Sequence, residues 1–158
     1  MDDTSTVTTL LVGFDSAWTP TKRGAMVGAV RSSDGSYREL GPPQPVSFVD
    51  AREGIRRWQS EFTPVDTIIL LDQPTIVRND SGQRPVENIV GSPVNLRYGG
   101  VQPANTGRHD MFGEGAPVWS FLSAFGCGSG GLVAQGTTRV LETYPVLAMM
   151  ALGWASCP

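Results

Sequence analysis

Residues 65–74 have the sequence Val-Asp-Thr-Ile-Ile-Leu-Leu-Asp-Gln-Pro, and this stretch decides the fold class. Val65 to Leu71 is a nearly continuous apolar run, which is typical of a strand buried on both faces of an α/β sheet. The run stops at Asp72-Gln73-Pro74, because proline cannot extend a strand ladder. We therefore predict an inner strand that ends in an aspartate.

Three more strands are predicted on the N-terminal side of this run. Thr6 to Phe14 is rich in β-branched and apolar residues and ends abruptly at Asp15. Gly24 to Arg31 has the same character, and Asp34-Gly35 is a strong hairpin signal. Ser36 to Leu40 is therefore predicted to run antiparallel to the second strand.

A helix is predicted between these strands and the apolar run. Residues 45–49 are extended, as an edge strand or as a loop. Asp50 is a plausible N-cap, and Glu53 follows three residues later as in a capping box. Apolar residues at helical spacing then predict a helix over Ala51 to Phe62.

The second half of the chain opens with an irregular insertion at residues 75–115, dense in Gly, Pro, Asn and Arg. Within it we predict a short helix around Pro85 to Val90. The elements predicted after it are a helix over Ala116 to Phe125, a strand over Arg139 to Thr143 and a helix from Val146 to Leu152. Three antiparallel strands followed by helix–strand units predict a mixed sheet flanked by helices. This order matches an α/β, ribonuclease H-like fold, in one domain over residues 1–158.

Composition narrows the class of protein. The apolar fraction is 40% and the charged fraction 17%, which indicates a globular chain. The net charge of −3, without a basic run, argues against a large nucleic-acid footprint. Cys127 and Cys157 form neither a disulfide framework nor a metal-ligand spacing. The N-terminus lacks the features of a signal peptide and no apolar stretch is long enough for a membrane span, so we expect a cytoplasmic protein.

Carboxylates are the candidate catalytic residues. In the predicted order, the strands ending at Asp15 and Asp72 are neighbours, so the two carboxylates are expected to lie close together. Such a pair needs a cation or a shared proton, and oxygen ligands suit Mg²⁺ or Mn²⁺. Glu142, inside the later strand, is the third candidate, although it can equally face solvent at a sheet edge. An aspartate after a strand is also a common turn former, and Glu53 is better explained as a helix cap than as a further ligand.

The irregular insertion holds further candidates. Arginine presents a fork that suits phosphate, so Arg84 and Arg108 are predicted to bind substrate, unless they are simply solvated. His109 is better explained as a surface residue than as a proton-transfer group.

Several motifs in a fixed order resemble one family over roughly Leu11 to Leu152. The motifs are Gly13-Phe14-Asp15-Ser16-Ala17-Trp18, Leu71-Asp72-Gln73-Pro74, Arg84-Pro85-Val86-Glu87, Gly99-Gly100-Val101-Gln102-Pro103-Ala104-Asn105, Met111-Phe112-Gly113, Ala116-Pro117-Val118-Trp119 and Leu141-Glu142-Thr143-Tyr144-Pro145. The chain thereby resembles the bacterial family called domain of unknown function 429, whose members are predicted to be ribonuclease H-like nucleases.

The resemblance implies a metal-dependent nuclease with nucleic acid as its partner. Asp15, Asp72 and Glu142 match the family's acidic residues and would hold Mg²⁺ or Mn²⁺. The polar residues that match the family's loops, and would roof the site, are Arg84, Glu87, Gln102 and Asn105. Such domains usually continue into further helices that supply the last metal-binding carboxylate, whereas no acidic residue follows Glu142 here.

Three hypotheses follow from these residues. The first is a Mg²⁺- or Mn²⁺-dependent phosphodiesterase. The second is an inactive or small-ligand-binding domain on the same fold, favoured by the short C-terminal side, which would also expose an apolar face and favour a homodimer. The third, a relative of the actin-like sugar kinases, is least favoured because no glycine follows Asp15.

Overall fold

A computed structural model describes residues 6–89, 91, 101–126 and 138–153. Both cysteines, residues 99–100 of the family-like motifs and residues 127–131 of the glycine-rich stretch lie outside this part of the chain.

The described strands form one six-stranded mixed sheet, in the order β3-β2-β1-β5-β6, with β4 also paired to β2. The strands are β1 (Val7–Asp15), β2 (Gly24–Ser32), β3 (Tyr37–Glu39), β4 (Gln44–Val46), β5 (Asp66–Asp72) and β6 (Thr138–Glu142). β2 is antiparallel to β1, β3 and β4, whereas β5 is parallel to both β1 and β6. The predicted α/β class with a mixed sheet is confirmed, and five predicted strands lie within one residue of their expected bounds. The edge strand or loop expected at residues 45–49 is β4, which ends at Val46, because residues 48 and 49 begin α1.

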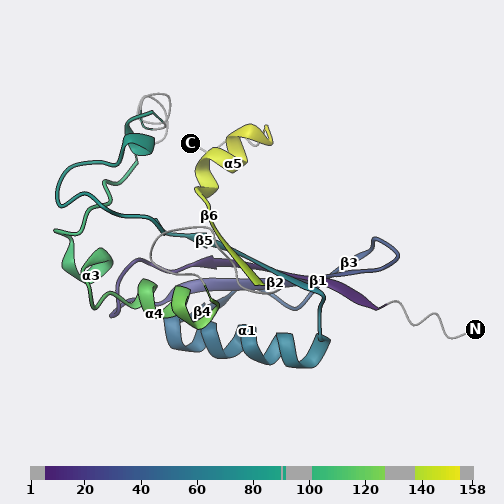
Figure 1. The fold of residues 1–158 in the computed structure, drawn as a ribbon. Coiled ribbons are helices and arrows are strands. Elements are labelled where there is room, and N and C mark those ends of the chain that lie inside the picture. Colours follow the sequence, from purple (N-terminus) through teal and green to yellow (C-terminus); the bar gives the residue numbers. More distant parts are fainter. Residues whose placement is uncertain (1–5, 90, 92–100, 127–137, 154–158) are drawn as a thin grey trace, which may run out of the picture.

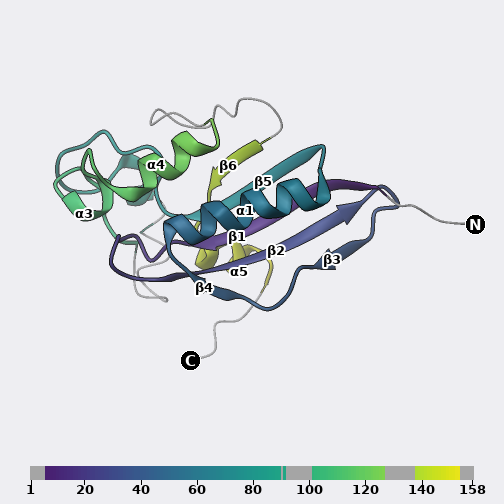
Figure 2. The ribbon, with the colours of Figure 1, turned by 90° about the horizontal axis from the view of Figure 1, so that it is seen from below.

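Helices lie on both faces of this sheet. They are α1 (Phe48–Phe62), α3 (His109–Phe112), α4 (Pro117–Ala124) and α5 (Pro145–Ala151), and residues 85–89 are also helical. Figures 1 and 2 show α1 and α4 on one face and α5 on the other. Within the described residues, no helix combines the length and apolar character needed to cross a membrane.

The main core lies between the sheet and the helices α1 and α4. Alternate residues of β1, among them Leu10 and Phe14, are buried on this face. The Phe14 ring packs against Phe48 of α1 and Phe121 of α4, with ring centroids 5.4 and 5.3 Å apart. These contacts fix the end of β1, which carries Asp15.

The opposite face of β5 is less covered than the sequence predicts. Ile69 and Leu71 are fully buried on the α1 side, but Leu70 is 43% exposed. The prediction of a strand buried on both faces is therefore wrong for this part of the chain. The neighbouring position in β1 is Gly13, which has no side chain to shield Leu70 on that face.

The start of α1 also corrects a prediction. The helix begins at Phe48, its N-cap is Ser47, and Asp50 occupies the third helical position. The Asp50 N–H donates to Ser47 Oγ at 3.2 Å, and the Ser47 N–H donates to Asp50 Oδ2 at 3.1 Å. Glu53 is exposed within the helix and does not cap it. Starting one turn earlier buries Phe48 in the core, a gain that a start at Ala51 would forfeit.

Loss of the Ser47 hydroxyl is expected to destabilise the protein. Ser47→Ala leaves the Asp50 N–H without its side-chain acceptor, which costs about 1 kcal/mol. Urea unfolding of the wild type and the variant measures this loss. Ser60→Ala, at an exposed position inside α1, is the matched control and is expected to be as stable as the wild type or about 0.5 kcal/mol more stable, because alanine has the higher helix propensity. Equal stability of Ser47→Ala and the wild type would contradict the capping role.

Candidate functional site

The carboxyl ends of β1 and β5 place two aspartates side by side. β1 and β5 are parallel, and Asp15 is the register partner of Asp72. Register partners in adjacent strands have side chains on the same face of the sheet. The structure thus brings together the first two sequence-predicted site residues, at one edge of the sheet.

The two aspartates differ in their environment. Asp15 is exposed, whereas Asp72 is half-buried. Burial, and then the negative charge of Asp15, raise the pKa of Asp72 to about 6. Burial and the charge of Asp72 also raise the pKa of Tyr144, so this phenol lies within electrostatic range of Asp72. The pair is therefore a place where added positive charge is favourable.

The raised pKa of Asp72 predicts a pH dependence of stability in the absence of divalent cations. An aspartate in an unfolded chain has a pKa of about 3.9, so the folded protein binds more protons than the unfolded one between about pH 4 and 6. The contribution of Asp72 to stability is expected to fall across that window as pH rises, by about 1 kcal/mol after allowing for solvent screening. The measurement is the difference between wild-type and Asp72→Asn unfolding free energies in chelator. A difference that is constant from pH 4 to 7 would contradict the shift.

The turn after Asp15 has an unusual backbone. Ala17 and Trp18 have φ angles of 53° and 62°, in the left-handed region that disfavours residues with a Cβ. The Ala17 N–H donates to Asp15 Oδ1 at 3.0 Å, and the Trp18 indole Nε1–H donates to the Asp72 carbonyl oxygen at 2.7 Å. Trp18 also packs on the buried Phe112 ring, with centroids 5.5 Å apart. The turn therefore links the two strand ends that carry the aspartates.

A second link joins the residues that directly follow the aspartates. Ser16 and Gln73 are buried, and Ser16 Oγ donates to Gln73 Oε1 at 2.5 Å. Gln73 Nε2 in turn donates to the Met111 carbonyl oxygen at 3.2 Å. These bonds tie both strand ends to α3, which contains Met111. The sequence motifs did not predict this role of Ser16 and Gln73, although a polar residue directly after each aspartate is a signal of it.

Glu142, the third predicted carboxylate, is engaged elsewhere. Its register partner in β5 is Leu71, and successive residues of a strand alternate between the two faces of the sheet, so the register does not put Glu142 beside Asp72. Arg84 forms a two-pronged contact with its carboxylate: Nη1 donates to Oε2 at 3.1 Å and Nη2 donates to Oε1 at 2.6 Å. The Thr75 N–H also donates to Glu142 Oε2 at 2.9 Å.

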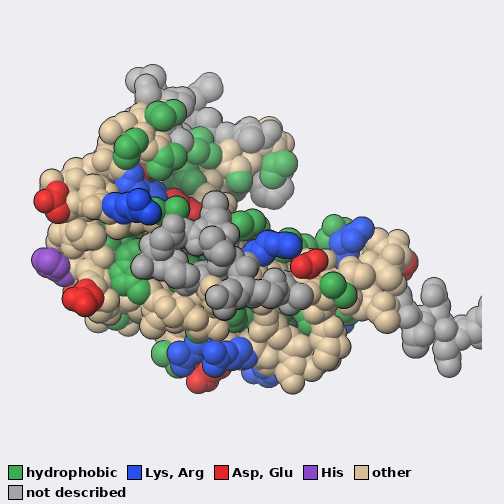
Figure 3. Space-filling model, in the orientation of Figure 1, with side chains coloured by type: hydrophobic (Ala, Val, Ile, Leu, Met, Phe, Trp, Pro, Cys, Tyr) green, Lys and Arg blue, Asp and Glu red, His purple; other side chains and the backbone are tan. Residues whose placement is uncertain are grey.

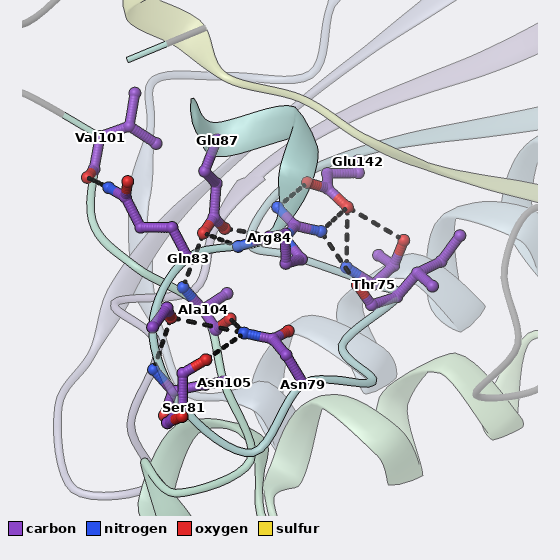
Figure 4. A network of polar contacts seen from close by, with 12 residues as sticks. Thr75, Asn79, Ser81, Gln83, Arg84, Glu87, Val101, Ala104, Asn105 and Glu142 are labelled. Atoms are coloured by element: carbon purple, nitrogen blue, oxygen red, sulfur yellow. Dashed lines mark hydrogen bonds and ion pairs between the residues drawn. The ribbon is translucent and has the colours of Figure 1, made fainter. Parts of the chain in front are cut away.

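Arg84 and Glu87 form the other half of this network, which Figure 4 shows at close range. Glu87 is 3% exposed and accepts hydrogen bonds from the N–H groups of Arg84 and Ala104 as well as from Arg84 Nε. Arg84 also donates to the Ile76 carbonyl oxygen. The Arg84 guanidinium therefore donates to acceptors within the protein. Its bonds to Glu142 hold the irregular insertion against the end of β6.

A cavity of about 410 Å³ opens in front of Asp72. Of the five predicted substrate-binding residues, Arg84, Glu87 and Gln102 line it; Asn105 and Arg108 do not. Asn105 Nδ2 donates to the Gly82 carbonyl oxygen, and Arg108 donates to Gln102 Oε1 at 3.2 Å. His109 is exposed at the start of α3, as expected.

Asp15 and Asp72 are the described carboxylates that the sheet register pairs. Mg²⁺ commonly uses one or two protein carboxylates and keeps several waters, so two carboxylates match the demand of one such ion. Within the described ranges, no group of three or more His, Cys, Asp or Glu side chains is placed to hold a metal ion. A site with Asp15, Asp72 and Glu142 as joint ligands stays a prediction.

Comparison with known proteins does not assign this site to a family. No protein-family model and no curated protein matches the chain. The resemblance to domain of unknown function 429 therefore stays a prediction from the sequence motifs.

Proposed function

We propose that this protein is a divalent-cation-dependent phosphodiesterase of the ribonuclease H-like, nuclease type. The observation that supports this proposal is the register pairing of Asp15 with Asp72 at the carboxyl ends of parallel strands. The sheet order, with one antiparallel strand beside parallel neighbours, is compatible with that fold. Mg²⁺ or Mn²⁺ would be held by Asp15 and Asp72, and the described carboxylates provide for one such ion.

The residues around the pair have distinct roles in this proposal. A bound cation supplies Lewis-acid stabilisation of the charge that develops on a phosphate group under attack. Trp18 holds the Asp72 backbone through its indole N–H, and the Ala17 N–H orients the Asp15 carboxylate. The Arg84–Glu142 ion pair keeps the irregular segment against the sheet, which leaves a partly enclosed chamber beside Asp72.

The alternative is a domain on the same fold that binds a small ligand without hydrolysing it. The observation that favours it is the engagement of Glu142 by Arg84 and Thr75, which removes the third carboxylate from the aspartate pair. Both proposals include the cation site, and they differ in whether the bound phosphate ester is hydrolysed.

Two measurements test the proposal in order. Mn²⁺ titration followed by electron paramagnetic resonance is expected to show a bound ion in the wild type and a loss of binding in Asp15→Asn. Hydrolysis of bis(p-nitrophenyl) phosphate is then measured with and without Mn²⁺. Cation binding without any cation-dependent hydrolysis would favour the non-catalytic alternative, whereas a wild type that binds no Mn²⁺ would overturn both.

A further inference from the structure

The charged side chains that line the cavity differ in whether they have ion-pair partners within the protein. Carboxylates outnumber cations in its lining, with Asp72, Glu87 and Glu142 against Lys22 and Arg84. The Arg84 charge is neutralised by its two glutamate partners. Lys22 is exposed and makes no ion pair with any described residue. Lys22 is therefore the cation left to meet an anionic ligand, and a phosphate also needs the cation on the aspartates to overcome the negative lining.

The other walls of the cavity suit a planar ring. Two aromatic residues, Trp18 and Tyr144, line it together with the aliphatic side chains of Val86, Val101, Met111 and Leu147. Aromatic side chains stack on nucleobases without regard to base identity. The Trp18 ring is already fixed by its hydrogen bond to the Asp72 carbonyl oxygen and by its packing on the Phe112 ring, so little conformational freedom is lost when a ligand ring docks against it.

A polar atom at the wall also lacks a partner. Thr19 lines the cavity, and its Oγ1 is buried with no hydrogen-bond partner among the described residues. Buried hydroxyls are nearly always hydrogen-bonded, so such an atom calls for an acceptor or donor from outside the protein. A nucleotide's ribose and phosphate oxygens provide both.

We propose that this cavity binds a single nucleotide together with its divalent cation, the phosphate meeting Lys22 and the cation on Asp15 and Asp72, and the base meeting Trp18 and Tyr144. The inference rests on the proposed cation site and narrows its substrate from nucleic acid to a mononucleotide-sized phosphate ester. A cavity of about 410 Å³ is near the small end of the usual range for ligand pockets, about 300–1,000 Å³.

The surface charge supports a small ligand over a polymer. Proteins that track a polynucleotide backbone present a continuous row of cations. On the face in Figure 3 the Lys and Arg side chains of the described residues lie in separate groups, interspersed with acidic ones. The chain as a whole carries a net charge of −3.

Binding to the full chain tests the proposal directly. Isothermal titration calorimetry compares AMP, adenosine, inorganic phosphate and a single-stranded DNA dodecamer, each in Ca²⁺ and in EDTA. AMP is expected to bind in Ca²⁺ about tenfold more tightly than adenosine or phosphate alone, and to lose that advantage in EDTA. Lys22 is the only lysine in the sequence, so acetylation by an N-hydroxysuccinimide ester, followed by mass spectrometry of the peptide that contains Lys22, reports on this site. AMP with Ca²⁺ is expected to protect Lys22 from acetylation.

A pair of neighbouring variants isolates the Lys22 contribution. Lys22→Gln is expected to weaken AMP binding about tenfold while adenosine and Mn²⁺ binding stay as in the wild type. Arg23→Gln is the matched control, because Arg23 pairs with Asp50 and does not line the cavity. It is expected to bind AMP as the wild type does.

The outcomes separate this inference from the proposed function. Mn²⁺ binding without AMP binding or Lys22 protection would overturn the nucleotide proposal and leave the phosphodiesterase proposal standing. Tighter binding of the dodecamer than of AMP would do the same. Failure of the wild type to bind Mn²⁺ would overturn the proposed function, and the Mn²⁺ titration alone detects it.

Discussion

Replacing Asp72 by asparagine is expected to abolish cation binding and cation-dependent hydrolysis without harming the fold. Asparagine has nearly the same shape but no negative charge, so the site loses one of two anionic ligands. Loss of a residue that only supports a metal ligand costs about 10–100-fold in metal affinity, so loss of the ligand itself is expected to reach at least the upper end of that range. Mn²⁺ titration and phosphodiester hydrolysis measure both effects.

Stability distinguishes this loss from misfolding. In the wild type without cation, burial and the charge of Asp15 penalise the ionised Asp72 above about pH 6. Removing that charge is therefore expected to raise the free energy of unfolding at pH 7.5 by about 1 kcal/mol, discounted for solvent screening. The matched control is Asp66→Asn at the other end of β5, where the carboxylate pairs with the exposed Arg139. Wild-type cation affinity in Asp72→Asn would show that Asp72 is not a ligand.

The aspartate pair could be predicted because its determinants are local in sequence. Each strand is an apolar or β-branched run that stops at a residue unable to continue it, and the Asp34-Gly35 turn fixes the hairpin between β2 and β3. Once the strand order is given, parallel neighbours bring their carboxyl ends to one edge. Asp15 and Asp72 follow from that rule without any knowledge of side-chain packing.

The network around Glu142 could not be predicted in the same way. Arg84 and Glu142 are 58 residues apart, and nothing local shows which acceptor a given arginine fork will meet. The start of α1 shows a second limit, because Ser47 and Asp50 are both good N-caps and only the burial of Phe48 decides between them. α3 is four residues long, too short for a helical period to be recognised.

The position of Lys22 at the cavity could not be predicted from the sequence either. It lies in an exposed segment between β1 and β2, and no pattern distinguishes a lysine that lines a cavity from one that faces solvent. The hydrogen bond from Trp18 to the Asp72 backbone was equally hard to predict, since it depends on a backbone conformation that this residue type disfavours. Residues that contradict local preferences tend to serve a tertiary or functional need, so such exceptions are useful guides once a structure is known.

Removing the Arg84 guanidinium is expected to be the most destabilising single change in the irregular segment. Arg84→Met keeps most of the side-chain volume but leaves Glu87, 3% exposed, without its ion-pair partner. An uncompensated buried charge costs about 3–5 kcal/mol, which lowers Tm by about 10 °C in a protein of this size. Thermal unfolding of the wild type and the variant measures the loss.

Three further variants separate the network role of Arg84 from phosphate binding. Arg108→Met, in the same segment, removes a hydrogen bond to Gln102 and a weak one to the Met111 sulfur, and is expected to cost about 0.5 kcal/mol or less. Arg84→Lys keeps the charge but cannot form the two-pronged contact with Glu142, so it is expected to recover only part of the stability. Adding Glu87→Gln to Arg84→Met is expected to restore stability further, because the orphaned charge is gone. If Arg84→Met instead unfolds like the wild type and weakens only nucleotide binding, Arg84 is a substrate ligand and the ion-pair network is dispensable for the fold.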